Sequence, residues 1–292
     1  MYLAILLTLI IFLLLICSRS LFVKFFLSFL SDLNSFIIFF SLTFERKYLI
    51  VVSTSGSSGM HKQDKLIKYN VKDIFQKVAI EKYDLMNDVM SLGAHRLWKK
   101  YYVDLIENLH LSSENILDIA SGTGDIFYSL NRSKNLFAID PVSEMHSISQ
   151  VKNSKKSINY ETGFAEKMPY KKNYFQIISC TYGVRNFEDR NKAFSEITRC
   201  LKKNGYFLFM EFGKPKRDLL LEPFNLYLNK WLPLIGSIVA KDRHSYKYLA
   251  ESIQNFPSQD NIIIQAESTG LTHQKTIDFL SGANSIYIFK KL

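Results

Sequence analysis

The sequence has little cysteine. Its 292 residues include only three cysteines, Cys17, Cys180 and Cys200, and none of them forms a C-x-x-C pair. A sparse and odd set of cysteines argues against a disulfide framework and against a cysteine-based metal site, and it favours a reducing compartment. We therefore expect a functional site without a metal ion.

The sequence also lacks a long run of lysine and arginine, although its formal net charge is +10. Without such a run, and without the spacing of zinc ligands, a basic balance does not indicate a nucleic-acid partner. The excess positive charge forms either a solvated surface or a surface attracted to anionic lipid. No internal repeat is visible, and the length allows one large domain with additions.

Charge is absent from residues 1–17, which are almost entirely apolar. A membrane-spanning helix needs about 20 such residues. The stretch lacks the basic start of a secretory signal and the arginines of a typical mitochondrial transit peptide. Three interpretations stay open: a membrane anchor, an atypical targeting segment, or an upstream extension of a chain that starts at Met60. Because residues 53–59 read as a linker, we place a boundary between segment 1–59 and a domain 60–292.

A glycine turn follows a short apolar run at residues 116–125, which read Ile-Leu-Asp-Ile-Ala-Ser-Gly-Thr-Gly-Asp. The pattern predicts a strand, a tight turn and a helix start. Gly122 and Gly124 have no Cβ that would keep a ligand away from the backbone, and free N–H groups of the helix start face the same space. Asp140 ends the next predicted strand, where an acid binds ribose hydroxyls. The pattern predicts a nucleoside ligand.

The turn lacks the third glycine that a dinucleotide site usually has. Asp125 stands at the helix start, where a carboxylate offsets the dipole that a phosphate would use. Two further acids, Asp118 and Asp140, flank the same pocket. Such a site suits a cationic ligand without phosphate, and S-adenosylmethionine carries a sulfonium, an ammonium and a ribose. An ordinary strand, turn and helix without a ligand is the alternative interpretation.

Strand candidates alternate with helices along the chain. Such alternation implies a mostly parallel sheet with helices on both faces. The predicted strands are 116–120, 135–140, 158–163, 175–180, 205–211 and 285–290.

Two helices are predicted ahead of the first strand. One covers 67–82. In the other, Leu97, Tyr101, Leu105 and Leu109 recur at helical spacing with Ile106 beside them, and we expect this helix to pack against the sheet ahead of the first strand. The stretch of about 215–257 breaks the alternation. It is rich in aromatic residues and leucine, and we interpret it as inserted helices that form either an apolar lid or a second core layer.

Four motifs occur together in one order: residues 84–98 (DLMNDVMSLGAHRLW), 117–125 (LDIASGTGD), 183–186 (GVRN), and 248–253 (YLAESI) with 256–259 (FPSQ). Together they resemble the ubiquinone/menaquinone biosynthesis C-methyltransferase family, of the 2-methoxy-6-polyprenyl-1,4-benzoquinol methylase type. The resemblance runs from about residue 70 to the C-terminus. It implies an α/β, Rossmann-like class I methyltransferase fold dependent on S-adenosylmethionine, with a mostly parallel seven-stranded sheet, helices on both faces and an inserted helical lid.

The resemblance also implies which residues contact the cofactor S-adenosylmethionine. Position 164 is commonly polar in the family, so Phe164 keeps only a backbone contact, whereas Thr181 keeps the hydroxyl of a common serine. Asp118 is expected to face the amino group of the cofactor. The full set of expected cofactor residues is Asp118, Gly122, Thr123, Asp140, Phe164, Ala165 and Thr181.

Methyl transfer to a ring carbon needs a nucleophilic ring. Deprotonating a ring hydroxyl raises the electron density at the ortho carbon, and a ring proton leaves afterwards to a base or a water. We assign Arg185 to the phenolate, Asn186 to the orientation of the ring oxygen or a water, and Tyr83 to closing the pocket. A loop salt bridge is the alternative for Arg185, and plain packing is the alternative for Tyr83. For His95 we favour a helix-start or packing role.

The expected function is C-methylation of a polyprenylated benzoquinol in ubiquinone biosynthesis. Demethylmenaquinol, a small phenol or a sterol are alternative acceptors, and a non-catalytic scaffold of a quinone-synthesis complex is a further alternative. The expected partners are the polyprenylated quinol, a membrane surface, and a second copy or a quinone-synthesis complex. The expected location is the matrix side of the mitochondrial inner membrane, because residues 256–259 and Leu292 look slightly more like mitochondrial family members. A bacterial cytoplasmic or membrane-associated enzyme is the alternative.

Overall fold

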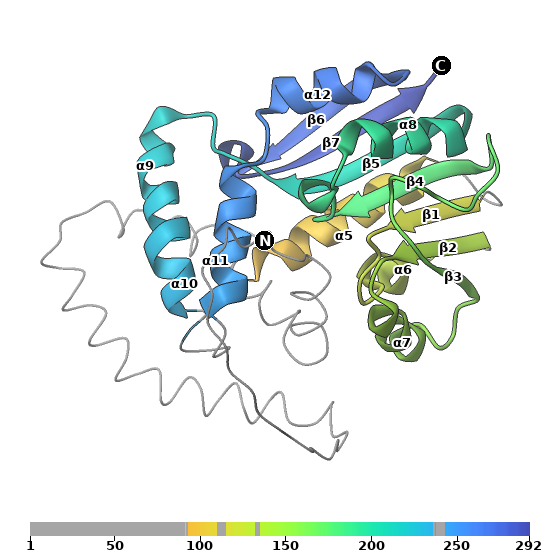
Figure 1. Cartoon of the computed structure of the whole chain (residues 1–292), viewed down its shortest axis with the longest axis horizontal. Helices are drawn as coiled ribbons and strands as arrows, with labels where there is room; N and C mark the ends of the chain where they lie inside the picture. The colour runs from red at the N-terminus through yellow and green to blue at the C-terminus, as the bar shows by residue number, and fades with distance from the viewer. Residues whose placement is uncertain (1–90, 92, 110–114, 132–134, 236, 238–242) are drawn as a thin grey trace, which may run out of the picture. The chain divides into compact units, whose positions relative to one another are not determined.

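The computed structural model describes residues 91, 93–109, 115–131, 135–235, 237 and 243–292 (Figure 1). All of them belong to the unit Tyr69–Leu292. The predictions for segment 1–59, for a helix over 67–82 and for Tyr83 lie outside the described residues. Within the described part, none of the helices combines the length and the apolar character needed to cross a membrane.

Seven strands of the described chain form one sheet in the order β3-β2-β1-β4-β5-β7-β6. The strands β1 to β5 pair in parallel, whereas β7 runs antiparallel to both β5 and β6. The strand order reverses between β1 and β4, and ligands of open α/β sheets bind at the carboxyl ends of the strands at such a point. The bounds are β1 Asn115–Ile119, β2 Asn135–Asp140, β3 Ile158–Thr162, β4 Phe175–Thr181, β5 Leu201–Phe212, β6 Leu271–Phe279 and β7 Asn284–Lys291.

The seven strands and the mostly parallel sheet confirm the expected fold class. All six strands predicted from the residues are present, but strand β6 was missed. Its sequence, Leu-Thr-His-Gln-Lys-Thr-Ile-Asp-Phe, lies at the edge of the sheet, and only its first residue is fully buried. Because an edge strand buries little, its sequence does not show the apolar run on which strand prediction depends.

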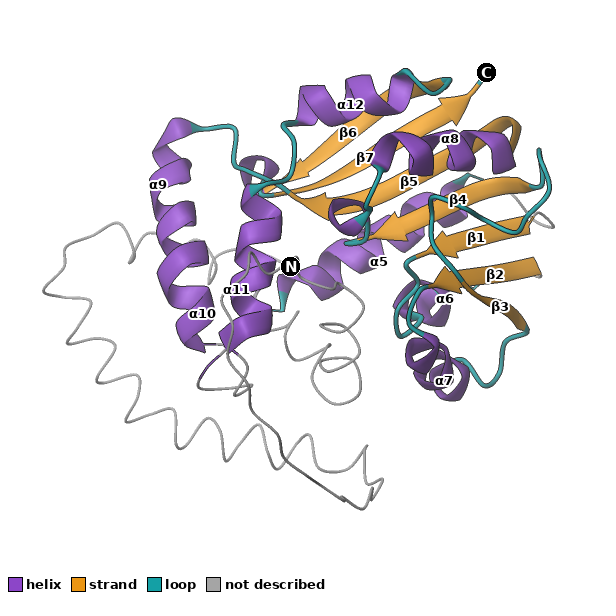
Figure 2. Ribbon diagram, viewed as in Figure 1, coloured by secondary structure: helices purple, strands orange, loops and turns teal. Residues whose placement is uncertain are grey.

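Helices cover both faces of the sheet (Figure 2). Alternate residues of each strand point to opposite faces. In β5, Leu208 and Met210 join one buried cluster with helix α5, while Phe207 and Phe209 join a second cluster with helices α8 and α12. The helices outside the insertion are α5 Ala94–Asn108, α6 Asp125–Ser129, α7 Ser143–Lys152, α8 Arg190–Cys200 and α12 Gln259–Glu267.

Helix α5 packs on the sheet as predicted. Of the residues named for it, Ile106 is buried, and Leu105 and Leu109 pack against the same core cluster. Leu97 and Tyr101 are 47% and 43% exposed, and their neighbours Trp98 and Tyr102 are buried instead. The Tyr102 hydroxyl donates to the carbonyl of Leu208 in β5 at 2.7 Å. Because bulky residues stand side by side at 97–98 and at 101–102, helical spacing alone does not decide which of each two is buried, and at both places the prediction named the exposed residue.

The stretch predicted as inserted helices contains α9 Asp218–Leu226, the π-helical turn η2 Tyr227–Trp231, α10 Leu232–Ile235 and α11 Arg243–Gln254. Leu228 and Leu232 are buried in the same cluster as helix α5, together with Tyr246 of α11. These side chains therefore extend the core, as the interpretation of a second core layer requires. Leu226 and Leu234 remain 43% and 48% exposed.

Candidate active site

The turn after β1 is open on one side and tightly packed on the other. A Cβ on Gly122 would meet nothing within 4 Å, whereas a Cβ on Gly124 would lie 2.1 Å from Oγ of Ser149 and 2.6 Å from Nδ2 of Asn153. Nδ2 of Asn153 also donates to the carbonyl of Gly124 at 3.2 Å. Gly124 therefore lets helix α7 approach the turn, and Gly122 leaves backbone open to a ligand.

Asp140 lies beside Gly122 at the end of β2. Its Oδ2 accepts a hydrogen bond from the backbone N–H of Gly122 at 2.9 Å, and its Oδ1 accepts one from the N–H of Val142 at 2.9 Å. Burial raises the pKa of Asp140, while these two hydrogen bonds act in the opposite direction. Each carboxylate oxygen keeps a second lone pair, so the fixed carboxylate has the capacity to accept two ribose hydroxyls.

Asp118 is buried within the sheet. Its carboxylate accepts a short hydrogen bond from the hydroxyl of Ser179, its neighbour across from β4, and only 1% of the residue is exposed. Burial raises the pKa of Asp118 to about 7, against the lowering effect of the Ser179 hydrogen bond. The structure thus gives Asp118 a partner inside the protein, and its contact with a cofactor amino group stays a prediction.

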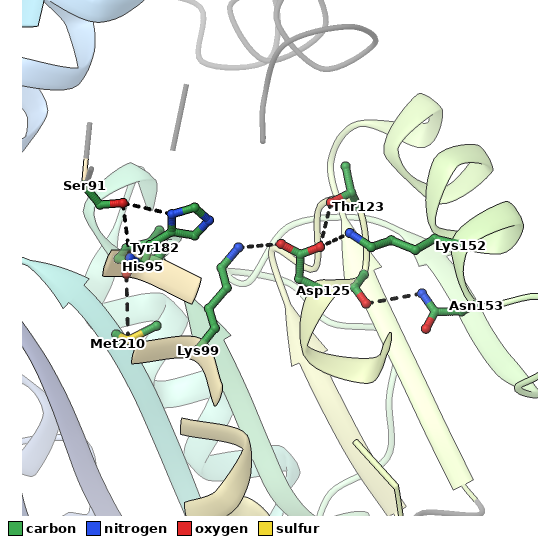
Figure 3. A network of polar contacts seen from close by, with 10 residues as sticks. Ser91, His95, Lys99, Thr123, Asp125, Lys152, Asn153, Tyr182 and Met210 are labelled. Carbon is green, nitrogen blue, oxygen red and sulfur yellow. Dashed lines mark hydrogen bonds and ion pairs between the residues drawn. The ribbon is translucent and has the colours of Figure 1, made fainter. Parts of the chain in front are cut away.

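Asp125 does not lend the pocket a net negative charge, which corrects the argument from sequence. Its Oδ2 lies 2.5 Å from Nζ of Lys99, and its Oδ1 pairs with Nζ of Lys152 (Figure 3). Burial tends to raise the pKa of Asp125, but the two lysines hold it well below its usual range. The carboxylate of Asp125 is therefore bound by two ammonium groups of the protein. Sequence spacing gave no signal for these lysines, which are distant in the chain.

The remaining expected cofactor residues lie around the same strand ends. Thr123 is buried in the turn, and its hydroxyl donates to Oδ1 of Asp125 at 3.4 Å. The end of β3 is held against β2, because the N–H of Gly163 donates to the carbonyl of Asp140 at 3.1 Å. In the turn that follows, Phe164 is 58% exposed and Ala165 is buried. Thr181 ends β4.

Arg185 forms a buried ion pair. It lies in the short helix η1 Val184–Asn186 that follows β4. Its Nη1 lies 2.5 Å from Oε1 of Glu211, and its backbone N–H donates to Oε2 at 3.1 Å. The side chains are only 4% and 0% exposed. The salt-bridge alternative for Arg185 is therefore present in the structure, and Glu211 fixes the guanidinium at the carboxyl ends of β4 and β5. Sequence reasoning missed Glu211, although it is a lone acid in the apolar run of β5.

Asn186 connects the end of β4 to the inserted helices. Its Nδ2 donates to the carbonyl of Tyr182 at 3.4 Å, and its Oδ1 accepts a hydrogen bond from the hydroxyl of Tyr248 at 2.8 Å. Tyr248 belongs to α11. Burial raises the pKa of Tyr248, against the nearby charge of Arg185. Tyr248 was not assigned from sequence, although it begins one of the four motifs.

His95 is buried on α5, four residues before Lys99. Its Nδ1 and the hydroxyl of Ser91 lie 2.9 Å apart, and its backbone N–H donates to the same hydroxyl at 3.1 Å. This contact with the preceding turn is the local role that the sequence favoured. Tyr182 lies on the same side of the network (Figure 3), and its ring stacks on Phe212 with centroids 4.5 Å apart.

These features define a class of protein. The sheet is open, and its β7 runs antiparallel beside β5. A glycine turn follows β1, and an acid ends β2. This combination is that of the class I methyltransferases that depend on S-adenosylmethionine. The described residues contain no cluster of side chains that would hold a metal ion. Gly122 and Asp140 fit the nucleoside of that cofactor, which the fold and the comparisons below imply.

The chain belongs to the ubiE/COQ5 methyltransferase family, whose profile matches residues 61–291. It is 39% identical over 220 residues to the ubiquinone/menaquinone biosynthesis C-methyltransferase UbiE of Rickettsia prowazekii, which covers 71% of this chain and 87% of that protein. It is 36% identical over 226 residues to UbiE of Francisella tularensis, covering 75% and 89%. The sequence resemblance to this family is thereby confirmed.

Solved structures agree on the fold. A SAM-dependent methyltransferase of Thermotoga maritima, described as a possible histamine N-methyltransferase, superposes with a TM-score of 0.54 at 17% identity, covering 76% of this chain and 99% of that one. A putative methyltransferase of Haloferax volcanii, solved with its Trm112 activator, gives a TM-score of 0.52 at 12% identity, covering 74% and 97%. At such low identity the likeness shows the fold alone.

Proposed function

We propose that this enzyme methylates a ring carbon of a polyprenylated benzoquinol, with S-adenosylmethionine as the methyl donor. The observation that carries the proposal is the pairing of Arg185 with Glu211 and of Asn186 with Tyr248 beside the nucleoside site. These pairs fix a guanidinium and a carboxamide at the carboxyl ends of β4 and β5. The names of the bacterial relatives, which are C-methyltransferases of ubiquinone/menaquinone biosynthesis, support the same acceptor class.

The protein's part in the reaction is to hold both reactants. When bound, S-adenosylmethionine supplies a methyl group on a positively charged sulfur. Asp140 accepts the ribose hydroxyls, and the turn around Ala165 borders the adenine. Arg185 stabilises negative charge on a ring hydroxyl, which raises electron density at the neighbouring ring carbon. Glu211 keeps the guanidinium in place.

Asn186 orients the ring oxygen or a water that receives a proton. Its carboxamide has two N–H donors, and one of them points to the carbonyl of Tyr182. With the cofactor held there, the ring carbon would form a bond to the methyl group as the bond from methyl to sulfur breaks, and the ring proton would then leave to water. The role expected for Tyr83, closing the pocket, stays a prediction, because this residue lies outside the described part of the chain.

Demethylmenaquinol is the second candidate acceptor, because the relatives' names cover both quinone pathways. A benzoquinol and a naphthoquinol present the same hydroxyl beside the same kind of ring carbon. The two acceptors therefore make the same demand on Arg185 and Asn186, and they differ in the width of the ring that the pocket must hold.

The test is a transfer assay with the full chain and isotope-labelled S-adenosylmethionine. The acceptors are a benzoquinol and a naphthoquinol with matched short prenyl tails, and mass spectrometry locates the added methyl group. We expect methylation at a ring carbon of the benzoquinol. Methylation of the naphthoquinol alone would move the assignment to menaquinone biosynthesis. Tight binding of S-adenosylhomocysteine without transfer to either ring would overturn the quinol acceptor, and a chain that binds no cofactor would instead be the non-catalytic scaffold.

The place of action is also a proposal. A polyprenylated acceptor resides in a lipid bilayer, so we propose that the enzyme works at a membrane surface. The expected matrix side of the mitochondrial inner membrane stays a prediction, and the similarity to bacterial UbiE proteins is compatible with the bacterial alternative. The homodimer and the quinone-synthesis complex also stay proposals. Cell fractionation with a tagged full-length chain would test the location.

A further inference from the structure

The side chain of Asn284, at the start of β7, is a buried polar group in an apolar part of the core. The residue is 0% exposed, and neither Nδ2 nor Oδ1 has a hydrogen-bond partner among the residues that the structure describes. A buried carboxamide without partners costs free energy, because it loses its bonds to water and gains none in the protein. Such a group is explained by a ligand that reaches it or by an internal water.

Asn284 points to the face of the sheet that carries α5 and the inserted helices. Its neighbour Ser285 points to the other face, where its hydroxyl donates to Oδ1 of Asp278 and accepts from Nε2 of Gln259 in α12. Successive residues of a strand point to opposite faces. Two residues further on, Ile286 lies in the buried cluster that includes α5 and the insertion. The carboxamide of Asn284 therefore lies in this apolar layer.

Aromatic residues flank Asn284 on both neighbouring strands. Phe212 of β5 and Phe279 of β6 are its direct cross-strand neighbours, and such neighbours point to the same face. The ring of Trp98 packs on both, with its centroid 6.3 Å from that of Phe212 and 5.7 Å from that of Phe279. Three rings and one carboxamide thus lie together. This combination suits a flat ring that carries a polar substituent.

The same rings connect Asn284 to the residues proposed to hold the acceptor. The ring of Phe212 stacks on that of Tyr182 with centroids 4.5 Å apart, and the carbonyl of Tyr182 accepts the hydrogen bond from Asn186. Glu211, the acid of the buried ion pair, directly precedes Phe212 in β5. Asn284 therefore lies one strand beyond these residues, at the same edge of the sheet.

The turn that precedes Asn284 is strained and firmly held. Leu280 and Ser281 have φ values of 49° and 57°, which are unfavourable for residues with a Cβ. The carbonyl of Ser281 accepts a hydrogen bond from the N–H of Lys216 at 2.7 Å, and Nζ of Lys216 lies 2.8 Å from Oδ2 of Asp278. Strained residues persist where the surroundings hold them, and they cluster at ligand sites. The turn thus ties the start of β7 to the segment that leads from β5 into α9.

We propose that Asn284 determines acceptor specificity, because Nδ2 of its carboxamide donates a hydrogen bond to an oxygen substituent of the acceptor ring. The inference rests on the proposed quinol acceptor, whose ring carries oxygen atoms besides the one assigned to Arg185. An acceptor that presents hydrocarbon at this place leaves the carboxamide unpaired, and sites of this kind discriminate strongly. The methoxy oxygen of a 2-methoxy-6-polyprenyl-1,4-benzoquinol fits, whereas the fused ring of a naphthoquinol presents only carbon.

Two acceptors that differ in one oxygen isolate this contact. One is the methoxy benzoquinol with a short prenyl tail, and the other carries an ethyl group in place of the methoxy group. Both keep the two ring hydroxyls, and the two groups are nearly equal in size. The transfer assay with the full chain and labelled S-adenosylmethionine gives kcat/KM for each acceptor. We expect the wild type to favour the methoxy acceptor by on the order of ten- to hundred-fold.

The variant Asn284→Leu should lose this preference, because leucine has a similar size and no polar group. The ratio of the two kcat/KM values should fall by about ten-fold or more, and kcat/KM for the ethyl acceptor should not fall. The urea midpoint of unfolding should move to a higher concentration, since an unpaired polar group leaves the core. Ser285→Ala is the matched control. It removes a buried hydroxyl on the opposite face of the same strand, and it should keep the wild-type preference.

Each failure has its own signature. An unchanged ratio in Asn284→Leu, or a wild type that uses both acceptors equally well, would overturn the role of Asn284 and leave the quinol acceptor in place. An equal loss for both acceptors with a lower urea midpoint would show a structural carboxamide bound to an internal water, which also overturns the proposal. A wild-type chain that binds S-adenosylhomocysteine but methylates neither quinol would overturn the proposed function, and the role of Asn284 with it.

Discussion

The buried ion pair between Arg185 and Glu211 leads to a quantitative prediction. Both side chains are almost fully removed from water, and Glu211 also accepts hydrogen bonds from the backbone N–H groups of Arg185 and Phe212. Removing one partner of such a pair leaves an uncompensated buried charge, which costs about 3–5 kcal/mol. We therefore expect Glu211→Gln to lower the free energy of unfolding by this amount, even though glutamine keeps the shape and one acceptor oxygen.

The double variant distinguishes a charge effect from a packing effect. In Arg185→Met together with Glu211→Gln no buried charge is left unpaired. The double variant should therefore lose less free energy of unfolding than Arg185→Met and Glu211→Gln lose in sum, by about 1–3 kcal/mol. The matched control is Glu251→Gln, which removes an exposed partner of Lys247 at 3.7 Å. Exposed pairs of this kind contribute about 0–1 kcal/mol.

The assay is urea unfolding of the full chain at neutral pH, followed by circular dichroism for the wild type, the three single variants and the double variant. A cost below ~1 kcal/mol for Glu211→Gln, equal to that of the exposed control, would refute the reasoning. Strict additivity of the two buried substitutions would also refute it, because independent side chains do not form a pair.

Three further predictions concern the strand ends. Burial raises the pKa of Asp118 from 3.8 to about 7, so its ionisation opposes folding increasingly as the pH rises from about 4 to about 7. Asp118→Asn should therefore leave the free energy of unfolding nearly unchanged at pH 4 and raise it by about 4 kcal/mol at pH 8. An equal effect at both pH values in urea unfolding would contradict this. Gly124→Ala should lower the free energy of unfolding by more than about 2 kcal/mol, because its Cβ would collide with α7. Gly122→Ala should lower it by about 1–2 kcal/mol and should chiefly weaken the binding of S-adenosylhomocysteine in calorimetry. A larger loss of stability for Gly122→Ala than for Gly124→Ala would contradict the turn geometry. Tyr248→Phe, which removes the hydroxyl bound to Asn186, should lower kcat about ten-fold and leave the affinity for S-adenosylhomocysteine unchanged; a matching loss of cofactor affinity would argue for a general structural defect.

The fold was predictable where local pattern and burial agree. The strands β1 to β5 and β7 carry apolar runs, and the glycine turn after β1 has its own chemistry, so both were located from the residues. The edge strand β6 and the burial of Trp98 and Tyr102 in α5 were not. In both cases the missing information is tertiary, because β6 buries little and because spacing in the sequence does not show that Trp98 is buried and Leu97 exposed.

The candidate site was predictable only in its local part. Gly122 and Asp140 are 18 residues apart, and the strand, turn and helix spacing brought both to one place. The partners of Asp125 lie 26 and 27 residues away on two helices, Glu211 lies 26 residues from Arg185, and Tyr248 lies 62 residues from Asn186. No spacing rule connects such residues, because their contacts depend on how helices dock on the sheet.

The polar partners also change how the site recognises a positively charged cofactor. Of the three acids near the turn, Asp118 is bonded to Ser179 with a pKa of about 7, and Asp125 is paired with two lysines. Asp140 alone of these three presents a carboxylate held by backbone donors at the open side of Gly122. In the proposed site Asp140 therefore supplies the acid for the ribose, whereas Asp118 and Asp125 are each bound by side-chain donors of the protein.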